Sequence, residues 1–146
     1  MKKMSASSKL VFRRHETEIS RQLNLVLQES ALDNHYSLHP RRLAELGPEL
    51  ARSLVTFVED AERDLESVGR NLASEGVGQK TLARISTRIR RVVASLQDVG
   101  IESLDAVDAF VESLLIGFIT AHEEQILKSQ EDLRRALAEA REGMGT

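Results

Sequence analysis

The chain has 146 residues, of which 41% are apolar and 29% charged, and its net charge is −3. This balance predicts one folded domain with a real core, and it gives no bulk attraction to nucleic acid or to an anionic membrane. Cysteine is absent and aromatic residues make up only 3%. The composition therefore excludes disulfides, thiolate metal sites, a cysteine nucleophile and stacking platforms for single-stranded nucleic acid.

We expect a cytoplasmic protein without a membrane partner. The absence of cysteine agrees with that location, no signal peptide is evident, and no apolar run approaches the roughly 18 residues of a membrane span. Residues 1–8 are polar, and we expect them to form a flexible N-terminus.

The first predicted helix extends from Lys9 to Ala31, with its apolar residues on one side: Leu10, Val11, Ile19, Leu23, Val26 and Leu27. Residues 32–39 predict a loop, because Asp, Asn and Ser favour turns. Pro40 fits the first position of a short helix over residues 41–46. Gly47 and Pro48 then predict a break, with Pro48 opening a third helix that carries Leu50, Leu54, Phe57 and Val58.

Two further helices are expected in the middle of the chain. The chain is expected to break near Asp60 and to resume as a helix with Leu65, Val68 and Leu72. Gly76 fits the left-handed position after that helix. A fifth helix is expected from Gln79 to Gln97, followed by a turn at Gly100. Gly69 and Gly117 lie inside helical patterns, which indicates close helix packing at both positions.

The last helix carries the most informative pattern. From Leu104 to Phe118 the apolar residues recur three and four apart, which predicts a wide stripe buried in the core. From Ile119 onward a narrower seam follows, with a spacing typical of a helix that packs on one partner helix. Its predicted members are Ile119, His122, Ile126, Leu133 and Leu137.

No Pro or Gly interrupts residues 119–141, so the helix is expected to continue to Glu142 before a short tail at 143–146. No segment alternates with period two. The sequence thus predicts an all-α fold with a helical domain over residues 9–118 and a coiled-coil-like exit helix over residues 119–142. A helix of this kind usually joins its domain to a partner subunit or to a following domain.

The sequence contains no catalytic motif, neither a Gly-rich phosphate loop nor a His-Glu-x-x-His pattern nor a nucleophile elbow. We therefore predict no enzyme, no catalytic residue, no metal site and no cofactor. His35 and His39 lie around a predicted loop and Pro40, which removes the geometry of a helical metal pair. His15 is expected to be exposed.

His122 is the histidine that needs most explanation, because it occupies a seam position where a core residue would be apolar. A solvated or hydrogen-bonded polar residue in a helix pair, a pH-sensitive group and a haem ligand are the alternatives. The scarcity of aromatic residues speaks against a haem pocket.

A basic face on the fifth helix is formed by Lys80, Arg84, Arg88 and Arg91. Because the chain is acidic overall, we interpret it as a solvated face paired with nearby carboxylates, with an acidic partner surface as the alternative.

Three segments resemble bacterial sensory input domains that precede STAS domains in stressosome co-antagonists of the RsbR type. They are HYSLHPRRLAELGPELARSLVTFVE, EGVGQKTLARIS and DAFVESLLIGFITAHEEQILKSQEDLRRAL. Some such domains are similar to globins that have lost haem. The resemblance covers about residues 11–138, rests on helix order, loop signatures and the exit helix, and carries over no functional residue.

The resemblance implies a globin-like helical bundle, a homodimer and a downstream output domain. The leading hypothesis is thus a non-enzymatic sensory or regulatory domain that dimerises and relays a signal through its C-terminal helix to a STAS-like output. The alternatives are a sensor that binds haem or a small apolar ligand, and a helical scaffold without a ligand.

Overall fold

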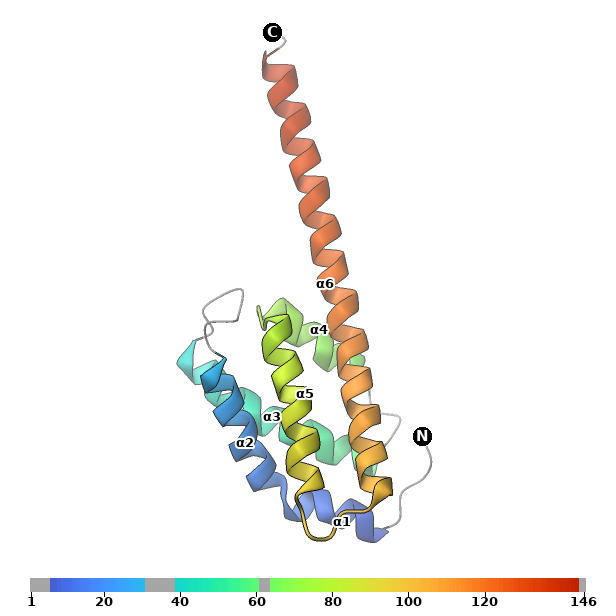
Figure 1. Ribbon diagram of the computed structural model, residues 1–146. Coiled ribbons are helices and arrows are strands. Elements are labelled where there is room, and N and C mark those ends of the chain that lie inside the picture. The colour runs from blue at the N-terminus through green and yellow to red at the C-terminus, as the bar shows by residue number, and fades with distance from the viewer. Residues whose placement is uncertain (1–5, 31–38, 61–63, 145–146) are drawn as a thin grey trace.

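The computed structural model describes residues 6–30, 39–60 and 64–144, and all the regular structure in these ranges is α-helical (Figure 1). The predicted loop over residues 32–38 and the N-terminus before residue 6 lie outside them. The helices are α1 (Ala6–Arg14), α2 (Glu16–Glu29), α3 (Pro40–Glu59), α4 (Glu66–Ser74), α5 (Gln79–Ala94) and α6 (Ile101–Met144). The predicted all-α fold with a long C-terminal helix is confirmed.

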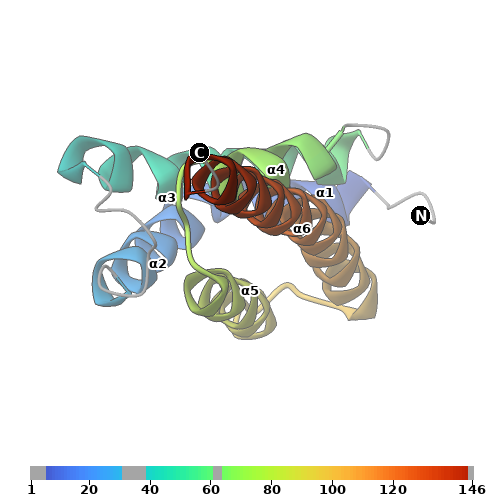
Figure 2. The same ribbon diagram turned by 90° about the horizontal axis from the view of Figure 1, so that it is seen from above.

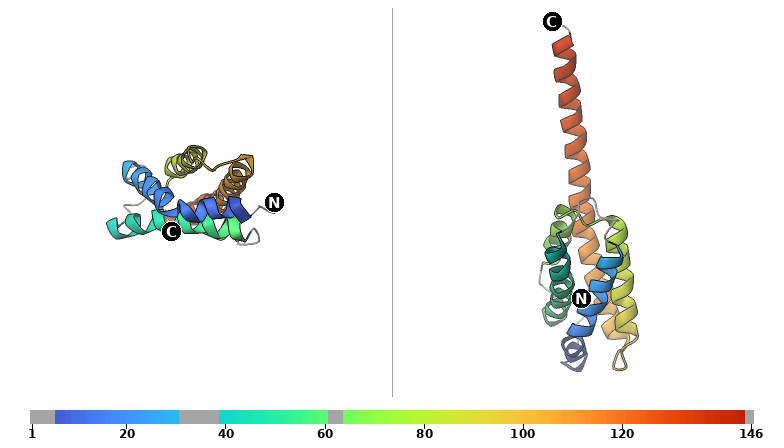
Figure 3. Two further views of the ribbon diagram at one scale, coloured as in Figure 1. Left: turned by 90° about the horizontal axis from the view of Figure 1, so that it is seen from below. Right: turned by 90° about the vertical axis from the view of Figure 1, so that its left-hand side faces the viewer.

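The helices enclose one core. α3 and α4 lie along one side, with α2, α5 and the first half of α6 opposite them (Figure 2). α1 crosses the end of the bundle that is remote from the projecting C-terminus (Figures 1 and 3). The core contains the tilted ring pair of Phe57 and Phe110, whose centroids are 6.0 Å apart. Phe12, Leu54 and Ile85 are also fully buried.

The predicted first helix is wrong in one respect, because the chain bends at His15 and forms two helices. His15 has φ −104° and ψ 13°, outside the helical range, and its N–H still bonds to the Val11 carbonyl at 3.1 Å. The bend directs α1 across α3 and α6, where Val11 and Phe12 are buried. Leu10, expected on the buried side, is 56% exposed.

The predicted break at Gly47 and Pro48 is also wrong, because α3 is continuous from Pro40 to Glu59 with Pro48 inside it. Gly47 is buried where α3 meets α2, and a Cβ there would lie 2.1 Å from Asn24 Oδ1. The close packing of α2 on α3 thus stabilises a helical path across two residues that disfavour one.

Other predicted boundaries are close to the observed ones. α3 ends next to Asp60, and α4 begins at Glu66, where the Asp64 carboxylate accepts a hydrogen bond from the Ser67 N–H at 3.2 Å. Gly76 has φ 94°, as expected for the left-handed position after a helix. α5 ends at Ala94, three residues before the predicted Gln97.

Candidate interaction surface on the C-terminal helix

α6 is packed against the bundle only in its first half. Its buried residues recur three and four apart and end at Ala121, and every residue from Glu123 to Met144 is exposed. The buried set is Ser103, Ala106, Val107, Phe110, Leu114, Gly117, Phe118 and Ala121. We call residues 101–121 the packed half and residues 122–144 the projecting half of α6.

α4 crosses the packed half of α6 at two glycines. A Cβ on Gly69 would lie 2.1 Å from the Leu114 carbonyl oxygen, and one on Gly117 would lie 1.9 Å from the Glu66 carbonyl oxygen. Neither position has room for a methyl group, so the two backbones touch directly. The close packing predicted at both glycines is confirmed. It places α4 beside the point where α6 leaves the bundle.

Polar contacts extend this crossing beyond the core. Arg70 Nη1 on α4 lies 3.2 Å from Glu124 Oε2, and Gln125 Nε2 donates to the Ala73 carbonyl oxygen at 3.4 Å. Both contacts join α4 to the first turn of the projecting half. The first turn of the projecting half is therefore held in place by α4.

Arg42 ties the other side of α4 to α3. Its Nε and Nη2 each lie 2.7 Å from a Glu75 carboxylate oxygen just after α4, and its Nη1 lies 2.6 Å from Glu49 on α3. The hydrogen bonds to Glu75 and Glu49 raise the pKa of Arg42 above its usual value, so the guanidinium stays charged. α4 is thereby linked both to the bundle and to the exit helix.

The apolar stripe of α6 changes faces between its two halves. Successive residues of an α-helix are rotated by about 100°, which places Ile119, Ile126 and Leu133 roughly half a turn away from Phe110 and Leu114. The large apolar residues on this outer face are all exposed: Ile116 (45%), Ile119 (50%), Ile126 (45%), Leu133 (62%), Leu137 (52%) and Met144 (87%). We call this set the outer stripe.

The face of the projecting half that continues the core face is polar instead. It carries Gln125, Lys128, Asp132 and Arg135, all exposed. The projecting half therefore cannot extend the core of its own bundle. Its large apolar residues lie on the outer stripe, except for the exposed Leu127 beside it. An exposed, narrow apolar stripe of this kind marks an interaction surface.

Four of the five predicted seam residues, Ile119, Ile126, Leu133 and Leu137, lie on the outer stripe. His122 lies about 60° to one side of Ile119. It is half-buried, stacks on Phe118 with ring centroids 6.1 Å apart, and lines an open groove of about 780 Å³. Ala73 and Ser74 of α4 form the other wall of this groove. Ile126 and Leu133 of the outer stripe line the same groove, so His122 lies between the α4 junction and the stripe, and its role in the seam stays a prediction.

Ile116 and Met144 belong to the stripe, although the predicted seam did not include them. Ile116 stands in the dense apolar run before Ile119, where both faces of the helix are apolar. The three-residue step from Ile116 to Ile119 identifies Ile116, and the seven-residue step from Leu137 to Met144 identifies Met144.

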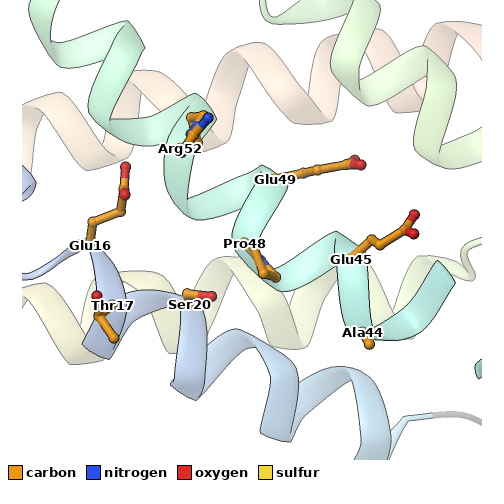
Figure 4. Close-up of a pocket in the computed structure, with 8 residues that line it drawn as sticks. All are labelled: Glu16, Thr17, Ser20, Ala44, Glu45, Pro48, Glu49 and Arg52. Atoms are coloured by element: carbon orange, nitrogen blue, oxygen red, sulfur yellow. The ribbon is translucent and has the colours of Figure 1, made fainter. Parts of the chain in front are cut away.

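A second groove, of about 550 Å³, lies between α2 and α3 (Figure 4). Glu45 and Glu49 extend from α3 away from α2, and both carboxylates pair with Arg42. No predicted site residue lines this groove, and its paired carboxylates form no acid–base arrangement. Its lining is Glu16, Thr17, Ser20, Ala44, Glu45, Pro48, Glu49 and Arg52.

The basic face of α5 makes contacts with α2. Arg88 Nη2 lies 3.7 Å from a Glu29 carboxylate oxygen, and Arg84 Nη1 lies 3.0 Å from Ser30 Oγ. These contacts agree with a solvated face that is partly paired within the chain. His39 accepts a hydrogen bond from the Arg41 N–H at its Nδ1, at 3.2 Å, whereas His35 lies outside the described residues.

Within the described residues, no three His, Asp or Glu side chains gather as metal ligands. No helix in these ranges is both long and apolar enough to cross a membrane. Comparisons of the chain with protein-family models, with curated proteins and with solved structures found no match.

Proposed function

We propose that this protein is a non-enzymatic sensory or regulatory domain that forms a homodimer and relays a signal through α6 to an output domain. The observation that carries the proposal is the change of apolar face along α6. One helix belongs to the bundle core over its first half and offers an unpartnered apolar stripe over its second half. A helix built in this way physically connects the packing of a domain to an external helical partner.

The resemblance of the sequence to STAS-linked input domains supports the same function. It adds a globin-like arrangement of the bundle and a STAS-like output as part of the proposal. In this scheme the exit helix is the element with two alternative packings, and a stimulus shifts the balance between them.

α4 is the element through which a change in the bundle reaches the projecting half. Its backbone contacts the backbone of α6 at Gly69 and Gly117, with no side chain between them. A shift of α4 therefore moves the part of α6 that leaves the bundle. Arg42 links the far end of α4 to α3 through Glu75. A displacement of α3 relative to α4 is thus transmitted to the point where α6 leaves the bundle.

Dimerisation is tested by burying charge in the outer stripe. The double variant Ile126→Asp with Leu133→Asp places two carboxylates in the interface, and an unpaired buried charge costs several kcal/mol. We expect sedimentation to show a concentration-dependent shift from dimer to monomer. The matched control is Lys128→Asp with Ala138→Asp, on the other faces of the same segment, and it should remain dimeric although it adds more negative charge. A dimer that persists in the stripe variant would place the interface elsewhere.

The relay is tested by changing the phase of the helix in a fusion of the chain to a reporter output domain that responds to helix rotation. Seven residues inserted after Gln130 preserve the repeat, whereas four residues shift it by a stutter and rotate the downstream part of the helix by about 40°. We expect the seven-residue insertion to retain the output and the four-residue insertion to alter it, with both domains folded. Equal output from the two would show that α6 is a passive tether.

A further inference from the structure

We propose that two copies of this chain pair along the outer stripe as a parallel, in-register, two-stranded coiled coil that begins at Ile116, inside the packed half of α6, and runs to Met144. This inference rests on the dimer proposed above and adds the orientation of its subunits, its register and its limits. The partner is a second copy of the same chain.

The spacing of the stripe provides the register. From Ile116 the steps alternate between three and four residues through the positions 116, 119, 123, 126, 130, 133, 137, 140 and 144. Four heptads are sustained, which is the length at which such a pattern indicates a coiled coil. The seam is about 42 Å long at 1.5 Å per residue. All nine positions are exposed, and seven of them are apolar. The two polar positions are Glu123 and Gln130.

Gln130 determines the orientation. In a parallel pair each core residue faces its own copy, so seven layers are wholly apolar and the two Gln130 amides meet. The two Glu123 carboxylates also meet, and this layer costs stability. The Gln130 amide both donates and accepts, so two copies satisfy each other across the seam. In antiparallel registers Glu123 faces Ile126, Leu133 or Ala140 of the second copy, and Gln130 likewise faces an apolar residue. Only in the parallel register do polar residues face polar residues and apolar residues face apolar residues.

Charge defines where the pairing begins. Continuing the positions of Ile119, Ile126 and Leu133 toward the N-terminus gives Glu112 and Asp105, both exposed. A parallel pair would oppose each of these carboxylates to its own copy, which is unfavourable. Glu123 lies between the large apolar layers of Ile119 and Ile126, whereas neither Glu112 nor Asp105 has large apolar layers on both sides to offset this cost. The two α6 helices therefore diverge on the N-terminal side of Ile116, and the two bundles lie side by side without a shared helix seam.

The flanks of the seam do not oppose self-association. One side of the seam is flanked by Thr120, Leu127, Arg134 and Arg141, and the other side by His122, Ser129 and Ala136. In a parallel pair the two sides face each other across the interface, so each arginine lies near a small neutral residue of the second copy. No like charges meet there, which favours a second copy of the chain over a strongly charged partner helix.

The absence of native cysteine makes disulfide mapping direct. Leu133→Cys and Leu137→Cys, made as separate variants, each place one thiol in the seam. In a parallel register both thiols face their own copies, within the Cα separation that a disulfide allows. In any antiparallel register only one seam position can face itself, so the two variants cannot both form efficient links. The control variants Lys128→Cys and Arg135→Cys place the thiol on the opposite face.

The measurement is the rate of disulfide-linked dimer formation under mild oxidation, after sedimentation of each reduced variant. We expect both seam variants to link at least about tenfold faster than both controls, because only seam thiols meet in the required geometry. Reduced protein that is monomeric throughout would refute the proposed dimer itself. A reduced dimer in which only one seam variant links, or in which the controls link equally fast, would refute the parallel register while the dimer stands. Ala140→Cys replaces either seam variant that fails to fold.

Discussion

The two halves of α6 belong to one uninterrupted helix but use opposite faces for their apolar residues. In the packed half, Phe110 and Leu114 face the bundle and Asp105 and Glu112 face outward. In the projecting half the polar side continues the core face, and the outer face carries the apolar residues. The comparison shows that the direction of an apolar stripe, and not only its width, identifies the partner of a helix segment.

Truncating a large apolar side chain should change the free energy of unfolding far more in the packed half of α6 than in the projecting half. Phe110→Ala removes a fully buried ring from contact with Phe57, and we expect it to lower the free energy of unfolding by about 3–5 kcal/mol. Leu133→Ala should change the unfolding of the monomer by less than about 0.5 kcal/mol, because its side chain is exposed there. Urea unfolding at concentrations below the dimer range measures both values. A comparable loss in the Leu133 variant would mean that the projecting half folds back on the bundle.

Glycine substitution provides a second contrast. Gly117→Ala forces a methyl group against the Glu66 carbonyl, and overpacking of this kind costs about 1–3 kcal/mol, more when a backbone must move. Gly143→Ala lies in the same helix with no atom within 4 Å of the added Cβ, so it should leave the unfolding of the bundle unchanged. Thermal unfolding of the two variants measures the difference. Equal midpoints would contradict the backbone contact between α4 and α6.

Most of this architecture can be predicted from patterns that are local in sequence. The three- and four-residue spacings of α5 and α6 and the left-handed Gly76 are dictated by helix geometry and backbone sterics. The glycines at 69 and 117 also have a local signal, because a glycine that persists inside a helix needs a packing reason. None of these features depends on knowing which helices meet.

The wrong predictions arise where tertiary contacts override local preference. Pro48 disfavours a helix interior, but the packing of α2 against Gly47 compensates for it. The bend at His15 has neither Pro nor Gly to mark it, and it accompanies the packing of α1 on α3 and α6 and the burial of Phe12. The groove that His122 shares with α4 is likewise a tertiary feature that a single helix repeat cannot reveal, while the predicted seam role of His122 stays a prediction.

Two seam positions of the projecting half, Glu123 and Gln130, are polar. Glu123 occupies a seam layer where two like charges meet in the proposed parallel pair, and a polar residue in such a layer costs stability. We expect Glu123→Leu to strengthen dimerisation by about tenfold, or about 1.4 kcal/mol. Sedimentation equilibrium measures the change. Glu139→Leu, on the opposite face of the projecting half and outside the seam, is the control, and an equal gain there would indicate general hydrophobicity instead of seam packing.

The smallest effect concerns a surface charge pair. On α2, Arg21 Nη2 and Nε lie 2.7 and 3.0 Å from the two carboxylate oxygens of Glu18, whereas Arg135 and Glu131 on the projecting half are 3.8 Å apart. Hydrogen bonds from Arg21 and then from Gln22 lower the pKa of Glu18 to about 2. The folded state thus favours the carboxylate, so the pair contributes its stabilisation above the ordinary Glu pKa and loses it as the pH falls toward 2. Both side chains are largely exposed, so the change in stability should be slight.

Carboxyl NMR titration of the Arg21→Gln variant should show the pKa of Glu18 rising toward its ordinary value, and an unchanged pKa would show that Arg21 does not hold this carboxylate in solution.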